Sequence, residues 1–589
     1  MDKRRRHRKF RQRCQSQALY IRPRRRYLDG VKILLVYPPF LDPRLDPEDI
    51  RHPPIGIHYV AAALQARGHA VDTLNRHERD TSPERWAGEL RARRPRVIGF
   101  SILHANRWGG IELARVAKQV DPAVTTVFGG VGATHLWEHL LANFPEIDYV
   151  VLGEGEESFP ALVECIERGD APSAASLPGL ALRRDGRPAR TAAPRPVREL
   201  DALPMPARHV DLAHLALTRG CVSNCTFCGS PAFWGRRVRS HSAAYFVEQM
   251  ACLRARGRRF VHVSDDTFTL DRGRVIEACR GIVARGLDIA WAAISRVDAV
   301  DEEVLAWMRR AGCVQVSYGV ESGSAAIRRR LNKRIREPDV RRAFDLTQRY
   351  GILARAYFIY GCPGESRATI RETIELMRAI RPLAAVFYIL DLFPGTALYA
   401  DMKRRLKVND DIWLRRVEDI MYFETDPALS AEQVLEYGRM LREAFYRGLP
   451  DVVAALDPVD DPEFRALHAD FFSRLAMTFD QGDYAGVEAI PDAPRLAEGL
   501  YRRALACHPD ARAFLGLGIL GQKAGRYQDS ADLLASGVSH FPDNEHLRMG
   551  LAVSLMHLGR FKEALATVER CPDQPQALQL AAACRQALR

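Results

Sequence analysis

Three cysteines in one short stretch constrain this chain more than any other feature. Cys221, Cys225 and Cys228 follow the spacing C-x3-C-x2-C, directly after the apolar run His214–Leu217. Three thiolates on one tight loop can ligate three irons of a [4Fe–4S] cluster and leave the fourth iron open. A zinc ion needs a fourth close ligand, and none stands in the right place in the sequence. The other alternative is three buried free cysteines without a metal.

The residues around the cysteines extend this pattern to a known family. Arg219-Gly220 precedes the first cysteine, and the aromatic Phe227 stands beside the third. Together they resemble the cluster loop of the radical SAM superfamily, in which S-adenosylmethionine (SAM) chelates the open iron. The resemblance implies that Cys221, Cys225 and Cys228 hold the [4Fe–4S] cluster and that Phe227 contacts SAM.

Upstream of this loop, residues 31–170 alternate apolar runs with helical stretches. Five runs are predicted strands, at 31–37, 71–74, 97–101, 125–130 and 149–153. Near-continuous apolar strands that alternate with helices are typical of a parallel, doubly wound sheet. Ligands of such sheets bind beyond the carboxyl ends of the strands. The sequence therefore predicts an α/β, flavodoxin-like (Rossmann-like) domain for a nucleotide or another cofactor.

Four short motifs in this domain resemble the cobalamin-binding domain that precedes many radical SAM domains. They are Pro53–Gly56, Ser101–Leu103, Phe128–Gly130 and Gly153–Glu156. The resemblance implies a set of cobalamin-binding residues, namely Ser101, Leu103, Gly129, Gly130, Gly153, Glu154, Gly155 and Glu156.

One departure concerns the cobalt. Many cobalamin domains carry D-x-H-x-x-G, whose histidine ligates cobalt, whereas Asp49-Ile50-Arg51-His52 has the wrong spacing. We therefore expect base-off cobalamin without a protein histidine, and the alternative is a degenerate domain that no longer binds cobalamin. His52, His58, His104 and His135 are predicted to be surface or hydrogen-bonding residues.

Residues 171–208 are rich in Pro, Ala and Arg and are predicted to be a linker. Asp185-Gly186 within them is a hairpin signal, and it resembles the linker hairpin of the family.

Residues 209–430 are predicted to form the radical SAM domain, a partial (β/α)6 barrel of the TIM type. Six predicted strands alternate with helices, at 215–217, 260–263, 289–294, 314–318, 356–359 and 386–390. Active sites in such barrels gather at the carboxyl ends of the strands. Each of the five strands after the cluster loop runs into polar or glycine-rich residues there.

These strand ends supply the residues that the resemblance assigns to SAM. A carboxylate suits the methionine ammonium, and an arginine suits its carboxylate. Glycines let the main chain approach the ligand. Besides Phe227, the predicted SAM-binding residues are Ser264, Asp265, Asp266, Arg296, Gly319, Glu321, Ser322, Ile359 and Gly361. The alternative for each residue is an ordinary strand-end turn or ion pair.

The resemblance implies a radical enzyme that uses a [4Fe–4S] cluster, SAM and cobalamin. We predict a radical C-methyltransferase for a specialised metabolite, peptide or lipid precursor, which needs an electron donor such as flavodoxin or ferredoxin. The alternatives are a radical cyclase or rearranging enzyme of the same family, and a cofactor-binding scaffold or sensor that acts through its tail. No residue is identified as catalytic.

The C-terminal part is predicted to be helical, with an extension at 431–495 and repeats at 496–589. Ala524-Gly525-Arg526-Tyr527 recurs as Leu558-Gly559-Arg560-Phe561, 34 residues later. A helix-turn-helix period of 34 residues is the signature of tetratricopeptide (TPR) repeats, which bind a protein partner or self-associate.

The charge distribution and the cysteine content limit the possible partners and the cellular location of the chain. Residues 1–30 carry twelve Lys and Arg against two Asp, which accounts for ten of the thirteen net positive charges. We therefore predict a disordered basic tail on a nearly neutral body, with no specific nucleic-acid partner. No apolar stretch is long enough for a transmembrane segment. Twelve scattered cysteines without a secretory segment favour a cytoplasmic location.

Overall fold

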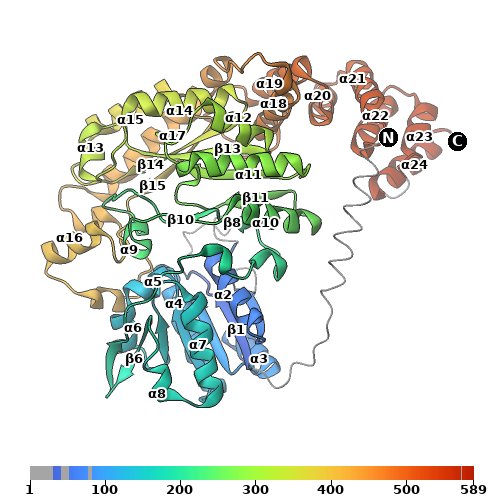
Figure 1. Cartoon of the computed structure of the whole chain (residues 1–589). Helices are drawn as coiled ribbons and strands as arrows, with labels where there is room; N and C mark the ends of the chain where they lie inside the picture. The colour runs from blue at the N-terminus through green and yellow to red at the C-terminus, as the bar shows by residue number, and fades with distance from the viewer. Residues whose placement is uncertain (1–30, 42–51, 77–81, 572–573) are drawn as a thin grey trace.

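The computed structural model describes residues 31–41, 52–76, 82–571 and 574–589; the predicted basic tail lies outside this range. Two open sheets, each covered by helices, are stacked with the N-terminal one below the other in Figure 1. The C-terminal helices extend to one side of this body. None of the described helices is long and apolar enough to cross a membrane.

The first sheet has seven strands in the order β2-β1-β3-β4-β5-β6-β7. These are β1 (Lys32–Tyr37), β2 (Ala70–Asn75), β3 (Val97–Ser101), β4 (Thr125–Gly129), β5 (Tyr149–Val151), β6 (Leu180–Arg184) and β7 (Arg187–Arg190). Strands β1 to β5 are parallel. Their order, 2-1-3-4-5, is that of flavodoxin-like sheets, so the predicted fold class of this domain is confirmed.

Helices cover both faces of this sheet. They are α2 (Ile55–Ala66), α3 (Pro83–Arg93), α4 (Arg107–Val120), α5 (Val131–His135), α6 (Trp137–Asn143), α7 (Gly155–Arg168) and α8 (Ala171–Ala174). Along β1, Leu34 and Val36 enter one hydrophobic core, whereas Ile33 and Leu35 enter another on the opposite face. Burial on both faces explains why the strand is apolar throughout instead of alternating.

The predicted hairpin forms, but in a different place. β6 and β7 pair with each other, and β6 also pairs antiparallel with β5. The hairpin therefore extends the first sheet, whereas the sequence analysis placed it in the linker. The cause is the apolar start of β6, where Leu180 and Ala181 are fully buried.

The second sheet has six parallel strands in the order β15-β14-β13-β12-β11-β8. These are β8 (His214–Leu215), β11 (Phe260–Val263), β12 (Ala290–Ser295), β13 (Cys313–Glu321), β14 (Leu353–Tyr360) and β15 (Ala384–Ile389). A short ribbon of β9 (Thr218–Arg219) and β10 (Arg239–Ser240) stands beside it. The strands are neighbours in chain order, which confirms the partial (β/α)6 barrel.

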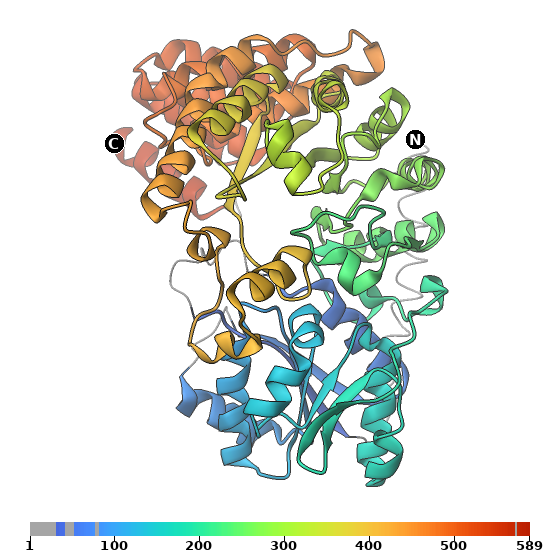
Figure 2. The same ribbon diagram turned by 90° about the vertical axis from the view of Figure 1, so that its left-hand side faces the viewer.

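The helices of this unit follow the strands. They are α9 (Ser230–Trp234), α10 (Ala243–Ala255), α11 (Arg272–Ala284), α12 (Glu302–Arg310), α13 (Ala325–Arg330), α14 (Glu337–Arg349), α15 (Arg367–Ile380) and α16 (Ala397–Leu406). One hydrophobic core continues from the first unit into the second: Phe128 and Trp108 belong to the same cluster as Leu392 and Trp413. The two units thus pack directly on one another, as Figure 2 shows from the side.

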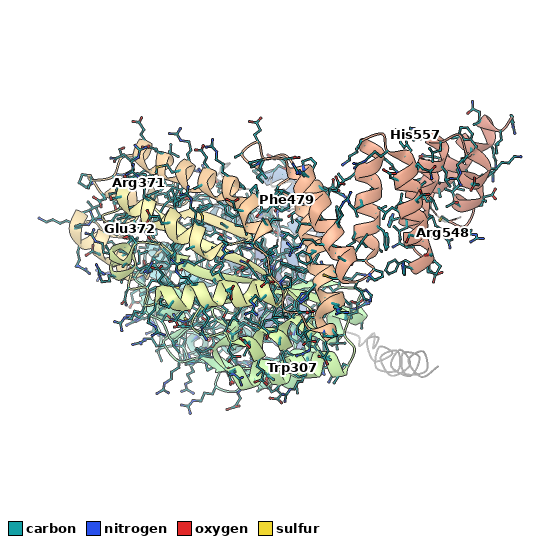
Figure 3. All side chains as sticks on the ribbon, turned by 90° about the horizontal axis from the view of Figure 1, so that it is seen from above. Trp307, Arg371, Glu372, Phe479, Arg548 and His557 are labelled. Carbon is teal, nitrogen blue, oxygen red and sulfur yellow. The ribbon has the colours of Figure 1, made fainter. Side chains whose placement is uncertain are left out.

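The described part of the C-terminal region contains eight α-helices. They are α17 (Ala431–Ala454), α18 (Arg465–Asp480), α19 (Ala493–Cys507), α20 (Ala511–Lys523), α21 (Tyr527–His540), α22 (Glu545–His557), α23 (Phe561–Val568) and α24 (Pro575–Ala587). Residues of α17 to α19, such as Phe479, enter the core of the second sheet. The later helices have small cores of their own and project outward with Arg548 and His557 (Figure 3).

The repeat signature has a structural basis. Gly525 and Gly559 occupy the turns between helices with φ of 72° and 74°, a backbone conformation that glycine adopts without strain. Tyr527, next in the motif, stacks on His557 of α22 with ring centroids 4.2 Å apart.

Candidate functional site

A cavity of about 700 Å³ lies where the two sheets face each other. Its lower wall comes from the carboxyl ends of β1, β3, β4 and β5 and from the loops that follow them. This is the switch point of a flavodoxin-like sheet, where ligands bind. All eight predicted cobalamin-binding residues line the cavity: Ser101, Leu103, Gly129, Gly130, Gly153, Glu154, Gly155 and Glu156.

This wall is built for close main-chain approach. Gly130 has φ of 92°, and a Cβ there would lie 2.7 Å from the carbonyl oxygen of Ile102. Ile102 in turn donates its N–H to Gly129 at 2.7 Å. Glycine is therefore required at position 130 by the neighbouring loop. The result is a wall with little side-chain bulk, which fits a large, flat cofactor such as cobalamin.

The two glutamates of this wall are bound to the other unit. Arg219 of β9 forms ion pairs with Glu154 at 2.6 Å and with Glu156 at 2.7 Å. Arg239 of β10 adds a 2.7 Å contact to Glu154. The guanidinium of Arg219 also lies over the ring of Tyr59, 4.7 Å from its centroid. We call these five residues the interdomain clamp.

The clamp is buried and its charges are matched. Burial alone would raise the pKa of Glu154, but Arg239 and Arg219 hold it below its usual value. Arg219 keeps its charge, because Glu156 and Glu154 outweigh the effect of burial and raise its pKa. Glu154 and Glu156 thus line the cavity, as predicted, but their carboxylates are engaged by arginines.

The cysteine loop begins two residues after Arg219. Cys225 is buried, Cys221 and Cys228 are half-buried, and Cys228 lines the cavity. None of the described cysteines forms a disulfide. Within the described range, no three His, Cys, Asp or Glu side chains are gathered around a single metal position.

The surroundings of the cysteines fit an iron–sulfur cluster. Burial raises the pKa of Cys225, while Lys333 and Arg296 act in the opposite direction and favour its thiolate. Burial also raises the pKa of Cys228, to about 11. Buried thiols of this kind become thiolates when iron binds, because the metal supplies the missing positive charge. The three thiols on one loop therefore suit the predicted [4Fe–4S] cluster.

The two aspartates after β11 point in opposite directions. Asp266 and Ser264 line the cavity, and Asp266 accepts a hydrogen bond from the Ser230 hydroxyl at 2.7 Å. Asp265 is 1% exposed, and its carboxylate accepts bonds from the N–H groups of Leu217 and Thr218, both at 2.8 Å. The Asp265 carboxylate thus holds the chain before the cysteines and, unlike Asp266, does not line the cavity; its contact with SAM stays a prediction.

Burial raises the pKa of both aspartates. The pKa of Asp265 rises to about 7, although the hydrogen bonds from Thr218 and Leu217 act to lower it, and the pKa of Asp266 also rises. Asp266 thus remains a candidate for the methionine ammonium, whose positive charge favours the ionised carboxylate.

The end of β13 holds a buried ion pair. Lys333 donates to Glu321 at 2.9 Å, and both side chains are nearly buried. Glu321 has φ of 65°, a strained conformation for a non-glycine residue. A Cβ at Gly319 would lie 2.4 Å from the Glu321 carboxylate and 2.8 Å from Lys333 Nζ, so Gly319 makes room for the pair.

Ser322, the residue after Glu321, has a different environment from the Glu321–Lys333 pair. It is fully buried, its hydroxyl pairs with Thr373 at 3.2 Å, and it accepts the N–H of Ser324 at 3.1 Å. These bonds fix the loop against α15, and the contact of Ser322 with SAM stays a prediction.

The remaining predicted residues lie around the cluster loop. Phe227 and Ile359 are partly buried against the shared core of the two units. Gly361 has φ of 74° and donates its N–H to Glu365, whose pKa is raised by burial to about 7. Arg296 contacts the Ser223 hydroxyl and pairs with Asp298 at 2.7 Å. Arg296 thus positions the cysteine loop.

The sequence analysis predicted no contact partner for Asp391, Lys333 or Arg219. Asp391, after β15, contacts His104 at 3.1 Å across the cavity. Lys333 pairs with Glu321, twelve residues earlier in the sequence, and Arg219 pairs with Glu154 of the first domain. Arg219 alone had a local signal, its place before the first cysteine. The other contacts join distant segments, and no spacing in the sequence reveals them.

Comparisons with known proteins agree with this architecture. Residues 50–163 match the B12 binding domain, residues 215–377 the Radical SAM superfamily, and residues 522–587 the tetratricopeptide repeat. An uncharacterized methyltransferase of Pyrococcus horikoshii is 31% identical over 382 residues, which cover 63% of this chain and 82% of that protein.

Two further comparisons bear on the fold and the reaction class. The anaerobic magnesium-protoporphyrin IX monomethyl ester cyclase of Rubrivivax gelatinosus is 27% identical over 379 residues, covering 61% of this chain and 68% of the cyclase. The structure of the methyltransferase TsrM from Kitasatospora setae, with cobalamin and a [4Fe–4S] cluster bound, has a TM-score of 0.56 at 18% identity. It covers 81% of this chain and 99% of TsrM.

These matches confirm the predictions of an enzyme, of its fold class and of its three cofactors. They do not test the individual site residues. This chain belongs to the radical SAM enzymes with an N-terminal cobalamin-binding domain, and it carries tetratricopeptide repeats at its C-terminal end.

Proposed function

We propose that this chain is a radical methyltransferase that acts on an unreactive carbon of a specialised metabolite, peptide or lipid precursor. One observation carries the proposal. The predicted cobalamin wall and the cluster loop, through Cys228, open onto the same cavity of about 700 Å³. A [4Fe–4S] cluster held by Cys221, Cys225 and Cys228 would, with SAM, supply the 5′-deoxyadenosyl radical that removes a substrate hydrogen atom, and cobalamin held by the lower wall would supply the methyl group.

The residues of the chain bind and orient these groups. In our proposal Ser101, Leu103 and the glycines of the lower wall hold cobalamin. Asp266 and Ser264 receive the methionine ammonium, and Lys333, partly released from Glu321, receives the methionine carboxylate. Gly319 leaves room for the side chains of Glu321 and Lys333.

The cavity also shields the reaction from water. Its walls include Phe100, Phe159, Trp234 and Phe393, so most of its lining is apolar. Among the described cavity residues, His104 and Asp391 form one His–Asp contact, and we propose that this pair contacts the substrate. Exclusion of water protects radical intermediates from side reactions.

A cyclase is the second candidate, because a relative with that name is 27% identical over 379 residues. The two reactions differ in their products. Methylation converts SAM to S-adenosylhomocysteine as well as to 5′-deoxyadenosine, whereas cyclisation needs no methyl donor.

The proposal also includes an electron donor, a protein partner and a cellular location. Reduction of the cluster needs a donor such as flavodoxin or ferredoxin. The repeats at α20–α24 present helices of the kind that bind a protein partner. The described cysteines are all free, which is consistent with a reducing cytoplasm.

The test is anaerobic reconstitution of the full chain with iron, sulfide and hydroxocobalamin, followed by metal analysis and visible spectra. We expect about four irons per chain, as for a [4Fe–4S] cluster, and one retained base-off cobalamin. Cys225→Ala should lose the iron, whereas Cys252→Ala, on α10 away from the loop, should keep it. Iron without cobalamin would contradict methyl transfer, and absence of a cluster would contradict the enzyme.

A further inference from the structure

The outer side of the cysteine loop carries exposed positive charge. Arg236 and Arg237 follow α9, Arg329 and Arg330 end α13, and Arg334 lies just beyond. All five side chains are exposed. We call them the arginine ring. Helices α9 and α13 lie on the same side of the molecule, at the left of Figure 1.

Hydrogen bonds tie both segments of the ring to the cysteine loop. Arg236 donates to the carbonyl of Val222 at 3.4 Å. Asn332 donates to the carbonyl of Asn224 at 2.6 Å, and the N–H of Thr226 donates to the carbonyl of Leu331 at 3.0 Å. The bonded loop residues Val222, Asn224 and Thr226 each stand next to Cys221 or Cys225 in the sequence.

The ring differs from neighbouring arginines in its lack of counter-charge. Nearby, Arg336 pairs with Asp339 at 2.7 Å and Arg341 with Glu337 at 2.6 Å. Within the described part of the chain, no ring member forms an ion pair. Clustered, uncompensated charges create a local potential that attracts a partner of opposite sign.

One member of the ring, Arg236, contacts an exposed part of the cysteine loop. Val222, next to Cys221, is 43% exposed, so the loop that holds the cysteines reaches the surface here. The same loop also reaches the cavity between the two sheets, where Cys228 lies. A protein that docks on the ring would thus stand one residue away from a cluster ligand.

We propose that the arginine ring docks an acidic one-electron carrier protein. One electron leaves the reduced cofactor of the carrier and reduces the cluster from its 2+ to its 1+ state, with no bond made or broken in the transfer. The inference rests on the proposed function, since only a cluster that is reduced in each turnover needs such a carrier. Charge complementarity supports the choice of an acidic partner.

Reduction kinetics test this docking site. The reconstituted full chain is mixed with hydroquinone flavodoxin, and bleaching of the cluster is followed by stopped flow from about 0.02 to about 0.3 M salt. Two double variants, R236E/R237E and R329E/R334E, are compared with R91E/R187E, a charge-matched control on exposed arginines of α3 and β7. Dithionite serves as a small reductant that needs no docking.

We expect a rate that falls with salt in the natural protein and the control. Each ring variant should react at least about 10-fold more slowly at low salt, because steering is lost. All proteins should be reduced equally by dithionite. Equal flavodoxin rates in ring variants and control would overturn the docking site alone. RNA binding that depends on the ring, with unchanged flavodoxin rates, would also overturn it. Failure of dithionite to reduce the cluster would overturn the proposed function itself.

Discussion

The two faces of the cysteine loop use arginine in opposite ways. On the cavity face, Arg219 is buried and held by Glu154 and Glu156. On the outer face, Arg236 and Arg237 are exposed and have no ion pair with any described residue. Burial forces a charge to be paired, because an isolated buried ion is very costly. Exposure leaves a charge free for a partner. Stability and electron entry should therefore depend on different arginines.

Removal of the buried arginine should have the largest effect. Arg219→Met leaves Glu154 and Glu156 without their main partner, which should lower the free energy of unfolding by about 3–5 kcal/mol. Urea unfolding of the reconstituted chain measures this loss, and iron content should fall with it. Arg219→Lys keeps the charge and should lose less. A loss below about 1 kcal/mol in Arg219→Met would contradict the clamp.

The clamp side should also be sensitive to acid. His241 is fully buried between Tyr59 and Asp201, each 3.0 Å from a ring nitrogen. Burial lowers its pKa from 6.5 to about 4, although Asp201 acts in the other direction. The unfolded chain binds this proton below pH 6.5, so the stability that the neutral ring contributes is lost as pH falls from 6.5 to about 4.

The size of this acid effect follows from the shift. A change of one pKa unit corresponds to about 1.4 kcal/mol, so protonation of His241 should account for about 3 kcal/mol at most. Unfolding measured at a series of pH values should show this decline, and His241→Gln should show a shallower one. An equally steep decline in His241→Gln would assign the acid sensitivity to other groups.

A smaller effect separates two adjacent aspartates. Asp265→Ala leaves the N–H groups of Leu217 and Thr218 buried without an acceptor, which should cost about 2 kcal/mol. Asp266→Ala removes a carboxylate that faces the cavity and should change stability by less than about 1 kcal/mol. Thermal unfolding measures both. Equal losses would mean that Asp266 also supports the fold.

These aspartates show where sequence reasoning reaches its limit. The motif placed both at the end of a strand, which is correct. Successive side chains of a strand point to opposite faces, so only one of two neighbours can face the cavity, and the motif does not say which. The eight residues predicted to bind cobalamin were easier to place at the cavity. Main-chain turns at strand ends face this side of the sheet whichever way their side chains point.

Long-range contacts set the second limit. The strands, the cysteine loop and the repeat glycines follow from local patterns in the sequence. The pairs Arg219–Glu156 and Glu321–Lys333 depend instead on how distant segments meet. The hairpin at β6 and β7 was misplaced for the same reason, because its own residues specify a hairpin but not the sheet that it joins.

The smallest expected effect on stability belongs to the exposed arginines. Arg236→Ala and Arg237→Ala remove side chains that have no ion pair in the described structure, so each should change the free energy of unfolding by less than about 0.5 kcal/mol. Urea unfolding beside Arg219→Met measures the contrast. A loss above about 1 kcal/mol would mean that the outer arginines also support the loop. The two faces would then differ in exposure alone, and a slower reaction with the electron carrier in ring variants would have a structural cause.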